Sequence, residues 1–499
     1  AALAICLAGH VWLGFALGLS VDEAHYALYA LHPALSYFDH PPLVGWVQIP
    51  FVFLGGFDWL MRVVPLLLWG LTAYLLFSFP THSPPPLSRP VDGRGELDFV
   101  ASKEYATYKF ILVGLFLLSP VHQLLGLALV PDSLLLPLTV WVMVLTWRFS
   151  SDISSRAYWM WLGLALGLAG LSKYTGVFLA LGAAIVLPAS HGLALFKVRG
   201  LWFAALIAAL LISPVFIWNA QHDWVSFAYQ LGHADGGTNS WEAKRVLTYS
   251  LIQLVAYGTL PLLGLVVFCV RLRKAHPALM RLCLAFGLPP LVLTLYLSGK
   301  GAALPHWTAA AWIALLPLCA LGLQHLWQSG SGYARQALRV LVCGLGGLQT
   351  LSIVALGLAM GTGGHWEGQA MAGSIAAETG NPFADLHDWQ GASKQAMALQ
   401  AEHHATALAV SNWTLASRLA WYARAKGASE SSAKVWALDG KNKQFDMWFG
   451  GLEYGQSFIW IDWSQMRQLH PVGCRKLDGA AGTYTGAHSS FDFYLCGRP

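Results

Sequence analysis

Long apolar runs, separated by short polar connections, occupy about the first 360 residues of the chain. Eleven of these runs approach the length that a helix needs to cross a hydrocarbon core of about 30 Å, and the shorter ones suggest tilted or kinked spans. They cover residues 3–19, 59–80, 108–130, 133–148, 157–171, 174–189, 200–218, 247–270, 278–297, 305–324 and 337–360. The run 43–56 is also apolar, but it is short and bounded by proline and glycine. It therefore predicts a helix that lies in the membrane interface.

The basic residues indicate how the predicted spans are oriented across the membrane. In the eleven-span count, one side of the membrane collects Arg89, Arg94, Lys103, Arg148, Arg156, Lys197, Arg199, Arg271, Arg273, Lys274, Arg335 and Arg339. An excess of lysine and arginine marks the cytoplasmic side. The opposite side then receives the loop after the first span, Asp132, Lys173, residues 219–246, residues 300–306 and everything after about residue 361.

Composition agrees with a membrane protein. Of the 499 residues, 56% are hydrophobic and only 11% are charged, with a mean hydropathy of +0.52. That is far too apolar for an ordinary soluble protein. The net charge of +5 is small and spread along the chain, which argues against nucleic acid as a partner. Residues 3–19 predict a first span and no cleavable signal.

Two regions depart from the apolar pattern. Residues 81–106 are polar, rich in proline and without periodicity, which predicts a cytoplasmic loop without a core of its own. From about residue 361 the chain becomes polar, and enough residues remain for a small domain. Helical stretches such as 413–426 alternate there with strand-like runs at 405–410, 457–461 and 491–496. We therefore predict an α/β domain over 361–499 on the side opposite the cytoplasm.

Cysteine usage adds one prediction about this domain. Five of the seven cysteines lie in predicted spans, and only Cys474 and Cys496 lie in the polar domain. Because the predicted topology puts both in an oxidising compartment, we predict a disulfide between them. The role of the domain's tryptophans stays open between acceptor binding and core packing; the candidates are Trp389, Trp413 and Trp448.

The stretch from Val21 to Leu43 places acids, histidines and tyrosines directly after an apolar run. An aspartate at this junction, Asp22, can cap a new helix. One face of that helix would then carry Asp22, His25, Tyr26 and Tyr29. The simplest alternative is a capped interfacial helix with its tyrosines at the level of the lipid headgroups.

The second half of this stretch favours a functional site. Pro41 and Pro42 bias the backbone before them toward an extended form, so Asp39 and His40 lie on a stiff corner. Carboxylates from both halves of the loop are thereby held near one membrane surface, which is more charge than an anchor needs.

Segments far apart in the sequence thus bring carboxylates, imidazoles and lysines to one membrane face, where we expect them to form one pocket. Asp132 and Lys173 are ionisable groups near helix ends, which mark function more often than simple pairing, although pairing stays an alternative. An interfacial aromatic belt is the simpler explanation for Trp218, Trp224, Trp241 and Trp307. The sequence contains no Walker loop, CxxC or HExxH motif, so we predict no required cofactor, and a metal is not indicated.

The motifs DEAHY and YFDHPPL, with PDSLLL at Pro131, GLSKYT at Gly170, PVFIWNAQHDW at Pro214 and LPHW at Leu304, resemble those of bacterial membrane glycosyltransferases with the GT-C fold. The nearest families are the protein O-mannosyltransferases and the lipid A aminoarabinose transferases (glycosyltransferase families 39 and 83). The resemblance covers about residues 1–360. It implies a mainly α polytopic bundle of about eleven spans plus interfacial helices, with a first periplasmic loop at 21–57. It also implies a place in the bacterial inner membrane, with the active site and the C-terminal domain facing the periplasm.

The resemblance implies transfer, with inversion, of a sugar from a polyprenyl-phosphate donor to lipid A, another glycolipid, a polysaccharide or a protein. Such a transfer needs a base for the acceptor proton and groups that hold the departing phosphate. The essential first-loop aspartate of the family matches Asp22. The second acidic position matches Asp39, and Glu23 is a neighbour of the first.

Two positions depart from the family pattern. His40 stands where the aminoarabinose transferases carry a lysine, and His25 stands where they carry an arginine. Neutral histidines do not guarantee positive charge at pH 7, so contact with the donor phosphate is assigned to Lys173, Lys300 and His306. The complete predicted substrate-binding set is His25, Tyr26, Tyr37, His40, Asp132, Lys173, Lys300 and His306.

The competing class of protein is a transporter or flippase of a lipid-linked sugar, which would also need many spans and intramembrane charges. Transporters tend to show internal repeats and helices broken at the bilayer midplane. This sequence shows no repeat, and its charged clusters lie in loops on one predicted face. We therefore expect an enzyme that acts as a monomer on a lipid-linked donor and a membrane lipid or glycan acceptor.

Overall fold

The structure is a computed structural model. It describes residues 2–80, 95–150, 152–234, 240–329, 331–364, 381, 383–424, 433–438, 443–453, 455–466, 473–479 and 482–497, without the side chains of 95–103, 233 and 234. The chain forms two compact units. The first consists of Ala1–Cys6, Pro65–Gly126 and Pro131–Ile353, and the second of Leu7–Val64, Leu127–Val130 and Val354–Pro499.

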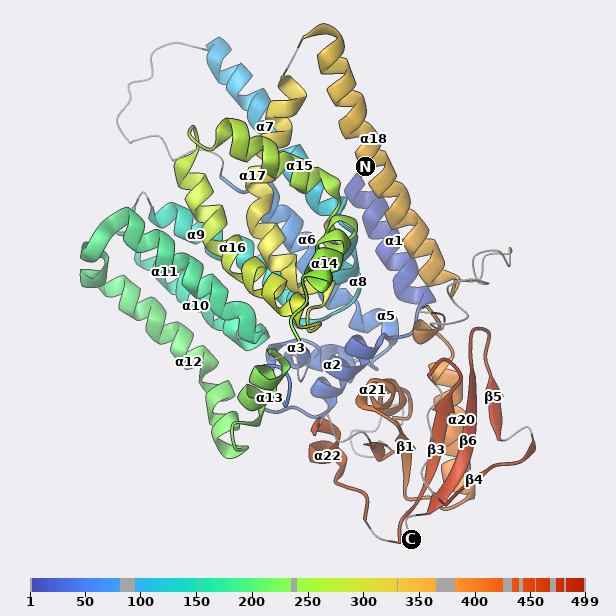
Figure 1. The fold of residues 1–499 in the computed structure, drawn as a ribbon. Coiled ribbons are helices and arrows are strands. Elements are labelled where there is room, and N and C mark those ends of the chain that lie inside the picture. The colour runs from blue at the N-terminus through green and yellow to red at the C-terminus, as the bar shows by residue number, and fades with distance from the viewer. Residues whose placement is uncertain are drawn as a thin grey trace. The chain divides into compact units, whose positions relative to one another are not determined.

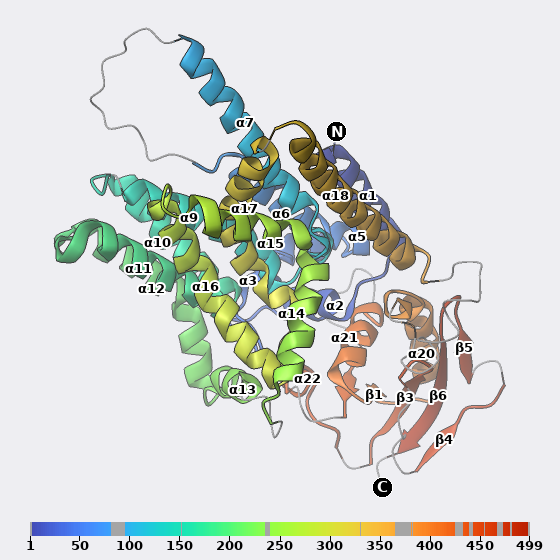
Figure 2. The same ribbon diagram turned by 45° about the horizontal axis from the view of Figure 1, so that its top comes forward.

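The first unit is helical (Figures 1 and 2). Its elements are α6 (Val63–Phe77), α7 (Gly95–Leu117), α8 (Pro120–Leu127), α9 (Pro131–Phe149), α10 (Arg156–Ser172), η1 (Tyr174–Gly176), α11 (Val177–His191), η2 (Gly192–Lys197), α12 (Arg199–Gln221), α13 (Val225–Ala234), α14 (Ala243–Tyr257), α15 (Thr259–Val267), η3 (Phe268–Leu272), α16 (Pro277–Gly299), η4 (Pro305–Thr308), α17 (Ala309–Gln328) and most of α18 (Gly332–Gly361). The η elements are 3-10 turns, except η3, which is a π-helical turn.

Helix α17 lies at the centre of this unit. Most of its side chains are buried, and it packs against α7, α9, α15 and α16. A Cβ atom on Gly264 of α15 would collide with the backbone of Cys319, and one on Gly322 would collide with that of Gly264. Small residues at such contacts allow membrane helices to pack backbone against backbone.

Each of the eleven predicted spans coincides with a helix or a pair of helices. Among the described residues, seven helices are long and apolar enough to cross a membrane, and the number reaches ten if each of three bent pairs is one span. Helix α10 is not among these seven helices, because it has only 17 residues. The chain is therefore a multi-pass membrane protein, and the count of eleven stays a prediction.

Two predicted spans are broken. In the stretch 108–130, α7 and α8 meet at a bend of 70°, because Pro120 opens α8 and a proline ring cannot continue the preceding helix. In the stretch 247–270, α14 and α15 meet at a bend of 100°. Gly258 between them has φ +87, a conformation that glycine adopts without strain.

The polar segment 81–106 differs from its prediction. Residues 81–94 lie outside the described residues, but α7 already begins at Gly95, so a loop was the wrong prediction for residues 95–106. Good helix formers such as Glu96, Ala101 and Lys103 continue directly into the apolar run. The apolar run 43–56 forms two short helices, α3 (Leu43–Trp46) and α4 (Ile49–Phe53), and its place in the membrane interface stays a prediction.

The second unit contains a six-stranded sheet. Its strands are β1 (Ala407–Val410), β2 (Val435–Ala437), β3 (Ser457–Trp463), β4 (Cys474–Lys476), β5 (Thr483–Thr485) and β6 (Ser490–Gly497). They run in the order β2-β1-β3-β6-β4, with β5 also paired to β6. Strand β1 is parallel to β2 and β3, while β6 is antiparallel to β3, β4 and β5. The three strands predicted from the sequence are confirmed. The helix predicted over 413–426 is confirmed over Trp413–Tyr422, and residues 425 and 426 lie outside the described residues.

The helices of this unit are most of α1 (Ala2–Ala16), α2 (Val21–Leu31), α3, α4, α5 (Asp58–Met61), η5 (Ala384–Leu386), α20 (Trp389–Glu402), α21 (Trp413–Tyr422) and α22 (Gln444–Phe449). Of these, α20, α21 and α22 contact strands of the sheet, and α2 packs against α21. Leu408 and Ile459 share a buried core with Leu28 of α2 and Leu419 of α21. The first loop therefore belongs with the C-terminal domain and not with the helical bundle, whereas the sequence placed their boundary near residue 360.

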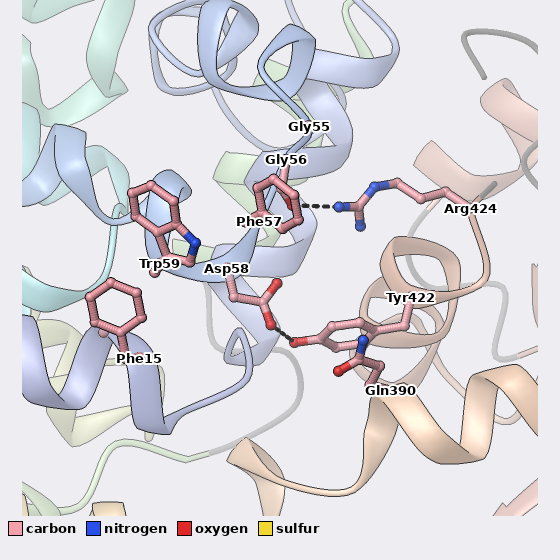
Figure 3. A pocket seen from close by; sticks show the side chains of 10 residues that line it. Phe15, Gly55, Gly56, Phe57, Asp58, Trp59, Gln390, Tyr422 and Arg424 are labelled. Carbon is pink, nitrogen blue, oxygen red and sulfur yellow. Dashed lines mark hydrogen bonds between the residues drawn. The ribbon is translucent and has the colours of Figure 1, made fainter. Parts of the chain in front are cut away.

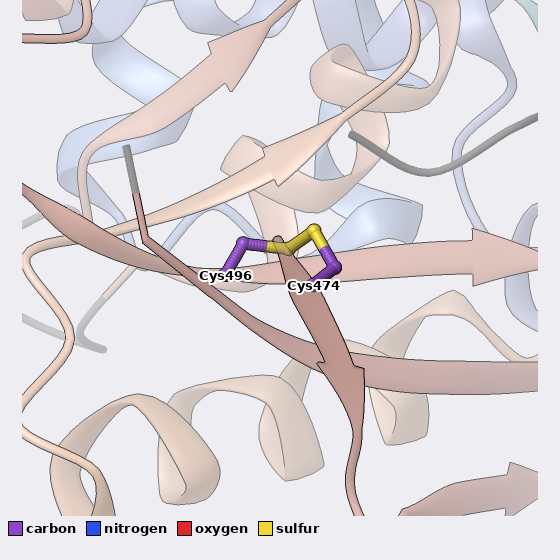
Figure 4. The surroundings of a disulfide bond; sticks show 2 residues. All are labelled: Cys474 and Cys496. Carbon is purple, nitrogen blue, oxygen red and sulfur yellow. A yellow bond between two sulfur atoms is a disulfide. The ribbon is translucent and has the colours of Figure 1, made fainter. Parts of the chain in front are cut away.

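The predicted disulfide is confirmed. Cys474 and Cys496 form a disulfide bond (Figure 4), and they are directly paired residues of the antiparallel strands β4 and β6. The bond closes a chain segment of sequence separation 22. It therefore joins the edge strand of the sheet to its neighbour by a covalent link.

Candidate functional site

Helix α2 presents the first-loop residues as the sequence predicts, but its cap differs. Ser20 is the N-cap: its hydroxyl accepts from the Glu23 backbone N–H, and the Glu23 side chain accepts from the Ser20 N–H at 3.0 Å. This reciprocal pair is a capping box. Asp22 instead lies in the first turn and is half-buried, so it is not needed as a cap.

A buried cluster joins α2 to the stiff corner of the loop. The Nε2 atom of His25 lies 3.3 Å from Oδ2 of Asp39, and the hydroxyl of Tyr29 donates to Oδ1 of the same carboxylate. His25 is 1% exposed and Asp39 7% exposed. His25 and Tyr29, four residues apart on one face of α2, thus both contact a carboxylate that lies outside the helix.

The Asp39 carboxyl is held in its ionised form. Burial by itself raises the pKa of a carboxyl group. Here the facing imidazole of His25, the nearby His40 and the Tyr29 hydroxyl outweigh burial, so the pKa of Asp39 lies well below its ordinary value. Strongly perturbed carboxyl groups are concentrated at functional sites.

Glu23 is engaged on both oxygens. Arg62 donates from Nε to Oε1 at 2.8 Å and from Nη2 to Oε2 at 3.0 Å, and it also donates to the carbonyl oxygens of Leu17 and Gly18 at the end of the first apolar run. Both partners are about 95% buried. A bidentate pair of this kind fixes geometry, so the structure gives Glu23 a structural contact at the start of α2.

The C-terminal domain completes the surroundings of His25. The Nδ1 atom of His25 lies 3.2 Å from Oγ of Ser417 on α21. The ring centroid of Trp413 lies 5.1 Å from that of His25, and that of Trp448 on α22 lies 5.9 Å away. Trp389 is instead a core residue, 2% exposed and packed against Trp463.

The remaining first-loop candidates surround this cluster. Tyr37 stacks on Tyr29 with ring centroids 3.5 Å apart, and its hydroxyl donates to the Tyr29 carbonyl oxygen at 2.7 Å. Tyr26 contacts His40 edge-on at 5.6 Å. These rings fix the corner that carries Asp39. The predicted residues Asp22, Glu23, His25, Tyr26, Tyr37, Asp39 and His40 are all brought to one region of the second unit.

A second cluster lies in the first unit. Asp132 is in the first turn of α9, and Lys173 ends α10. The Nζ atom of Lys173 lies 2.9 and 2.7 Å from the two oxygens of Asp132, and Nε2 of His306 lies 3.7 Å from Oδ2. Lys173 also lies 5.7 Å from the ring centroid of Trp307. The predicted residues Asp132, Lys173 and His306 therefore meet, although 174 positions separate the first from the last in the sequence.

One face of α14 anchors the segment that carries His306. The hydroxyls of Tyr249 and Tyr257 donate to the carbonyl oxygens of Leu304 and Pro305, both at 3.0 Å, and Thr308 donates to the Gln253 amide oxygen at 2.5 Å. The three α14 residues are four apart, which places them in one row on the helix. This row was missed at the sequence level, although its spacing could have indicated it.

Lys300 lies on the same connection. It ends α16 and is half-buried, and its carbonyl oxygen accepts from Arg245 Nη1 at 3.3 Å. Among the described residues, no group of three or more His, Cys, Asp or Glu side chains is placed to hold a metal ion. The union of the two clusters in one pocket stays a prediction.

Arg62 and Ser417 were missed as well. Arg62 had a signal, because it is a lone arginine near the start of a predicted span, and charged residues in spans are expected to have a partner. Ser417 had none, since it lies 392 positions from His25 in the sequence and its contact depends on how α21 packs against α2.

Comparison with known proteins adds the family. A model of the family "Dolichyl-phosphate-mannose-protein mannosyltransferase" matches residues 104–218, which include Asp132 and Lys173. The lipid A galacturonosyltransferase RgtD of Rhizobium johnstonii is 24% identical over 318 residues, or 62% of this chain and 62% of the relative. The match thus spans less than two thirds of that relative.

The fold has solved counterparts. The structure of ArnT from Cupriavidus metallidurans in the apo state matches with a TM-score of 0.54 and 15% identity, over 92% of this chain and 91% of that one. The structure of the same protein bound to undecaprenyl phosphate matches with a TM-score of 0.58 and 14% identity, over 92% of both chains. The chain thus has the GT-C fold of these structures, and the family model and the curated relative show that it is similar to membrane glycosyltransferases.

Proposed function

We propose that the protein moves a sugar from a polyprenyl-phosphate donor to an acceptor of the cell envelope, at the periplasmic face of the bacterial inner membrane. The observation that carries this proposal is the buried carboxylate of Asp39, kept ionised by His25 and Tyr29 of α2, the helix that also carries the half-buried Asp22. Burying an ionised group costs free energy. In a reaction that develops positive charge on a sugar, the negative charge of these carboxylates would stabilise the transition state.

The comparisons support the two substrates. One solved structure of similar fold holds undecaprenyl phosphate, which favours a lipid-phosphate donor here. The curated relative is named for lipid A, which favours a glycolipid among the predicted acceptors over a polysaccharide or a protein.

We assign the role of base to Asp22. Glu23 is bound on both oxygens by Arg62, and Asp39 is bound by His25 and Tyr29. An acceptor hydroxyl oxygen attacks the anomeric carbon opposite the phosphate, and Asp22 takes the hydroxyl proton. The bond from the anomeric carbon to the phosphate oxygen breaks, and its electron pair leaves with the polyprenyl phosphate. The configuration at the anomeric carbon is thereby inverted.

The other predicted residues bind and orient. The negative charge of Asp39 stabilises the developing positive charge on the sugar, and His25 holds that carboxylate in place. Lys173, His306 and Lys300 are proposed to hold the donor phosphate, with Asp132 orienting Lys173 through its two contacts. Tyr26, Tyr37 and His40 line the corner of the first loop.

The test is transfer by the purified protein in proteoliposomes loaded with a radiolabelled polyprenyl-phosphate sugar. We expect label on an added lipid A acceptor with wild type and none with Asp22→Asn. Label that crosses the bilayer on an unchanged donor would instead support the transporter that the sequence left as the alternative. Mass spectrometry of envelope glycans from a deletion strain identifies the natural product, and an unchanged glycome would count against the enzyme.

A further inference from the structure

A cleft in the second unit lies apart from all the candidate residues named above (Figure 3). It has a volume of about 230 Å³ and is lined by Gly14, Phe15, residues 55–59, Gln390, Tyr422 and Arg424. A second hollow of about 230 Å³ shares Phe15, Asp58, Gln390 and Tyr422 with it. Together the two hollows offer a concave surface with polar and aromatic side chains, as small-molecule sites do.

One wall of the cleft carries a fixed carboxylate. Asp58 accepts from the indole N–H of Trp421 at 3.1 Å and from the Tyr422 hydroxyl at 2.7 Å. The Tyr422 oxygen in turn accepts from the Leu19 backbone N–H at 2.7 Å. A carboxylate offers about four lone-pair sites, so Asp58 is held in one orientation and can still accept from a ligand.

A guanidinium group lies on the same wall. Arg424 stacks on the Trp421 ring, 3.4 Å from its centroid, and donates to the carbonyl oxygens of Trp421 and Gly56. Burial lowers its pKa to about 10, although nearby Asp58 acts in the opposite direction. Arginine has five N–H donors, and no carboxylate within the described part of the chain forms an ion pair with this one.

The third polar group is the amide of Gln390. It lies in the first turn of α20, its side chain is exposed, and it lines both hollows. Within the described ranges it makes no hydrogen bond. It therefore offers a donor and an acceptor to whatever enters the cleft.

The opposite wall is aromatic. The rings of Phe15 and Trp59 are stacked at 5.5 Å with an interplanar angle of 22°, and those of Phe57 and Trp59 at 6.3 Å and 10°. Trp59 is 42% exposed. Interfacial anchoring explains exposed aromatic rings near helix ends. It does not explain why a carboxylate, a guanidinium and an amide converge on the same hollow.

This combination has the chemistry of a carbohydrate site. A pyranose ring presents an apolar C–H face, which fits an aromatic platform, and a rim of hydroxyls, which fits planar polar side chains. The charges of Asp58 and Arg424 offset one another, so a neutral ligand suits the cleft better than a phosphate. The cleft lies at the last turn of α1 and at the start of the candidate span Asp58–Phe77, which favours a sugar attached to a membrane lipid.

We propose that this cleft binds a neutral sugar residue of the glycan acceptor. The inference rests on the proposed function in that it names the acceptor's glycan as the ligand. Sugar stacking on Trp59 and hydrogen bonds to Gln390, Asp58 and Arg424 hold that residue, which sets the position of the acceptor on the protein.

The binding test uses the purified full chain without donor. Saturation-transfer NMR with methyl glucoside, methyl galactoside and methyl mannoside should give signals with wild type. Trp59→Ala and Gln390→Ala should weaken binding about tenfold, the effect of losing one contact. Phe53→Ala is the control, because it removes an aromatic ring that is 82% exposed and does not line the cleft.

The transfer test separates the two proposals. With a glycolipid acceptor, the Trp59 and Gln390 variants should raise the acceptor KM about tenfold and leave kcat and the donor KM near wild type. Transfer with an unchanged acceptor KM would overturn the cleft proposal alone. Glycoside binding without any transfer would overturn the proposed function alone. Signals from short-chain phosphatidylethanolamine but from no glycoside would make the cleft a lipid headgroup site and overturn the sugar assignment.

Discussion

The Nε2 atom of His25 lies 3.3 Å from Oδ2 of Asp39, and the other ring nitrogen lies 3.2 Å from Oγ of Ser417. The Ser417 hydroxyl donates to the Trp413 carbonyl oxygen at 2.8 Å, so its oxygen can only accept from His25. An ionised carboxylate is also an acceptor only. Two acceptors thus face the two ring nitrogens of His25, an arrangement that an imidazole ring with a proton on each nitrogen would satisfy.

The first prediction concerns Ser417. Ser417→Ala removes the acceptor that fixes His25, so Asp39 loses its alignment. We expect kcat to fall about five- to tenfold, the effect of one lost hydrogen bond of about 1 kcal/mol, with the donor KM unchanged. Ser417→Thr, which keeps the hydroxyl, should restore most of the rate.

The protonation state itself can be measured. Nitrogen-15 NMR of histidine-labelled protein, with His25→Gln to assign the signal, should show two protonated ring nitrogens in wild type. A neutral tautomer at that position would contradict the hydrogen-bond assignment.

The second prediction is a pH dependence of stability. The folded pKa of Asp39 lies well below its ordinary value, so its ion pair stabilises the fold above about pH 4 and loses that effect as the pH falls further. Thermal unfolding in detergent should therefore show Tm falling from about pH 5 to pH 2. Asp39→Asn should have a lower Tm at pH 7 and a shallower slope. Equal slopes in the two proteins would remove Asp39 as the cause.

Local patterns explain why much of the first-loop site could be predicted. His25, Tyr26 and Tyr29 share the predicted helix because their spacing follows its period. The cap was misplaced on Asp22, although Ser20 with Glu23 three residues later is the stronger cap signature. Ser417 could not be found, because its approach to His25 depends on the packing of α21 on α2, which no local pattern records.

The apolar runs predicted the positions of the helices better than the bends within them. Apolar length placed a helix or a pair of helices at each predicted span, but the bends at Pro120 and Gly258 depend on single residues inside otherwise continuous runs. The grouping of the first loop with the C-terminal domain follows from tertiary packing around Leu28 and Leu419. No local sequence pattern marks either leucine as a contact between these two segments.

The third prediction concerns the donor phosphate. Lys300→Ala removes one charge-assisted contact, worth about 1.5–3 kcal/mol in a partly buried site. The donor KM should rise about ten- to hundredfold, and the acceptor KM should stay near wild type. Lys244→Ala is the matched control, because it removes the same charge from an exposed position. A change in the acceptor KM alone would assign Lys300 to the acceptor.

The fourth prediction concerns the disulfide. Breaking the bond between Cys474 and Cys496 should lower the free energy of unfolding by about 2–4 kcal/mol. Cys474→Ser and the addition of reductant should therefore lower the Tm of the C-terminal domain by similar amounts. Cys343→Ser, at an exposed free cysteine, should leave it unchanged. A thiol count that finds both cysteines reactive in the native protein would refute the bond.

The last prediction contrasts two neighbouring acids. Asp22→Asn keeps the shape of the side chain, and the Ser20 capping box is independent of it, so Tm should stay near wild type. Asn cannot take the acceptor proton, and general-base assistance is worth about 10²–10⁴-fold. Single-turnover transfer should therefore fall at least about a hundredfold while donor binding persists.

Glu23→Gln should behave in the opposite way. It breaks a buried pair with Arg62, which costs about 3–5 kcal/mol of stability, so Tm should fall clearly. Whatever fraction stays folded should transfer the sugar at a rate closer to wild type. Measuring Tm and the single-turnover rate for both variants distinguishes the catalytic role of Asp22 from the structural role of Glu23. Near-normal transfer by the Asp22 variant would sink the mechanism, because it would show that the reaction does not need this carboxylate as its base.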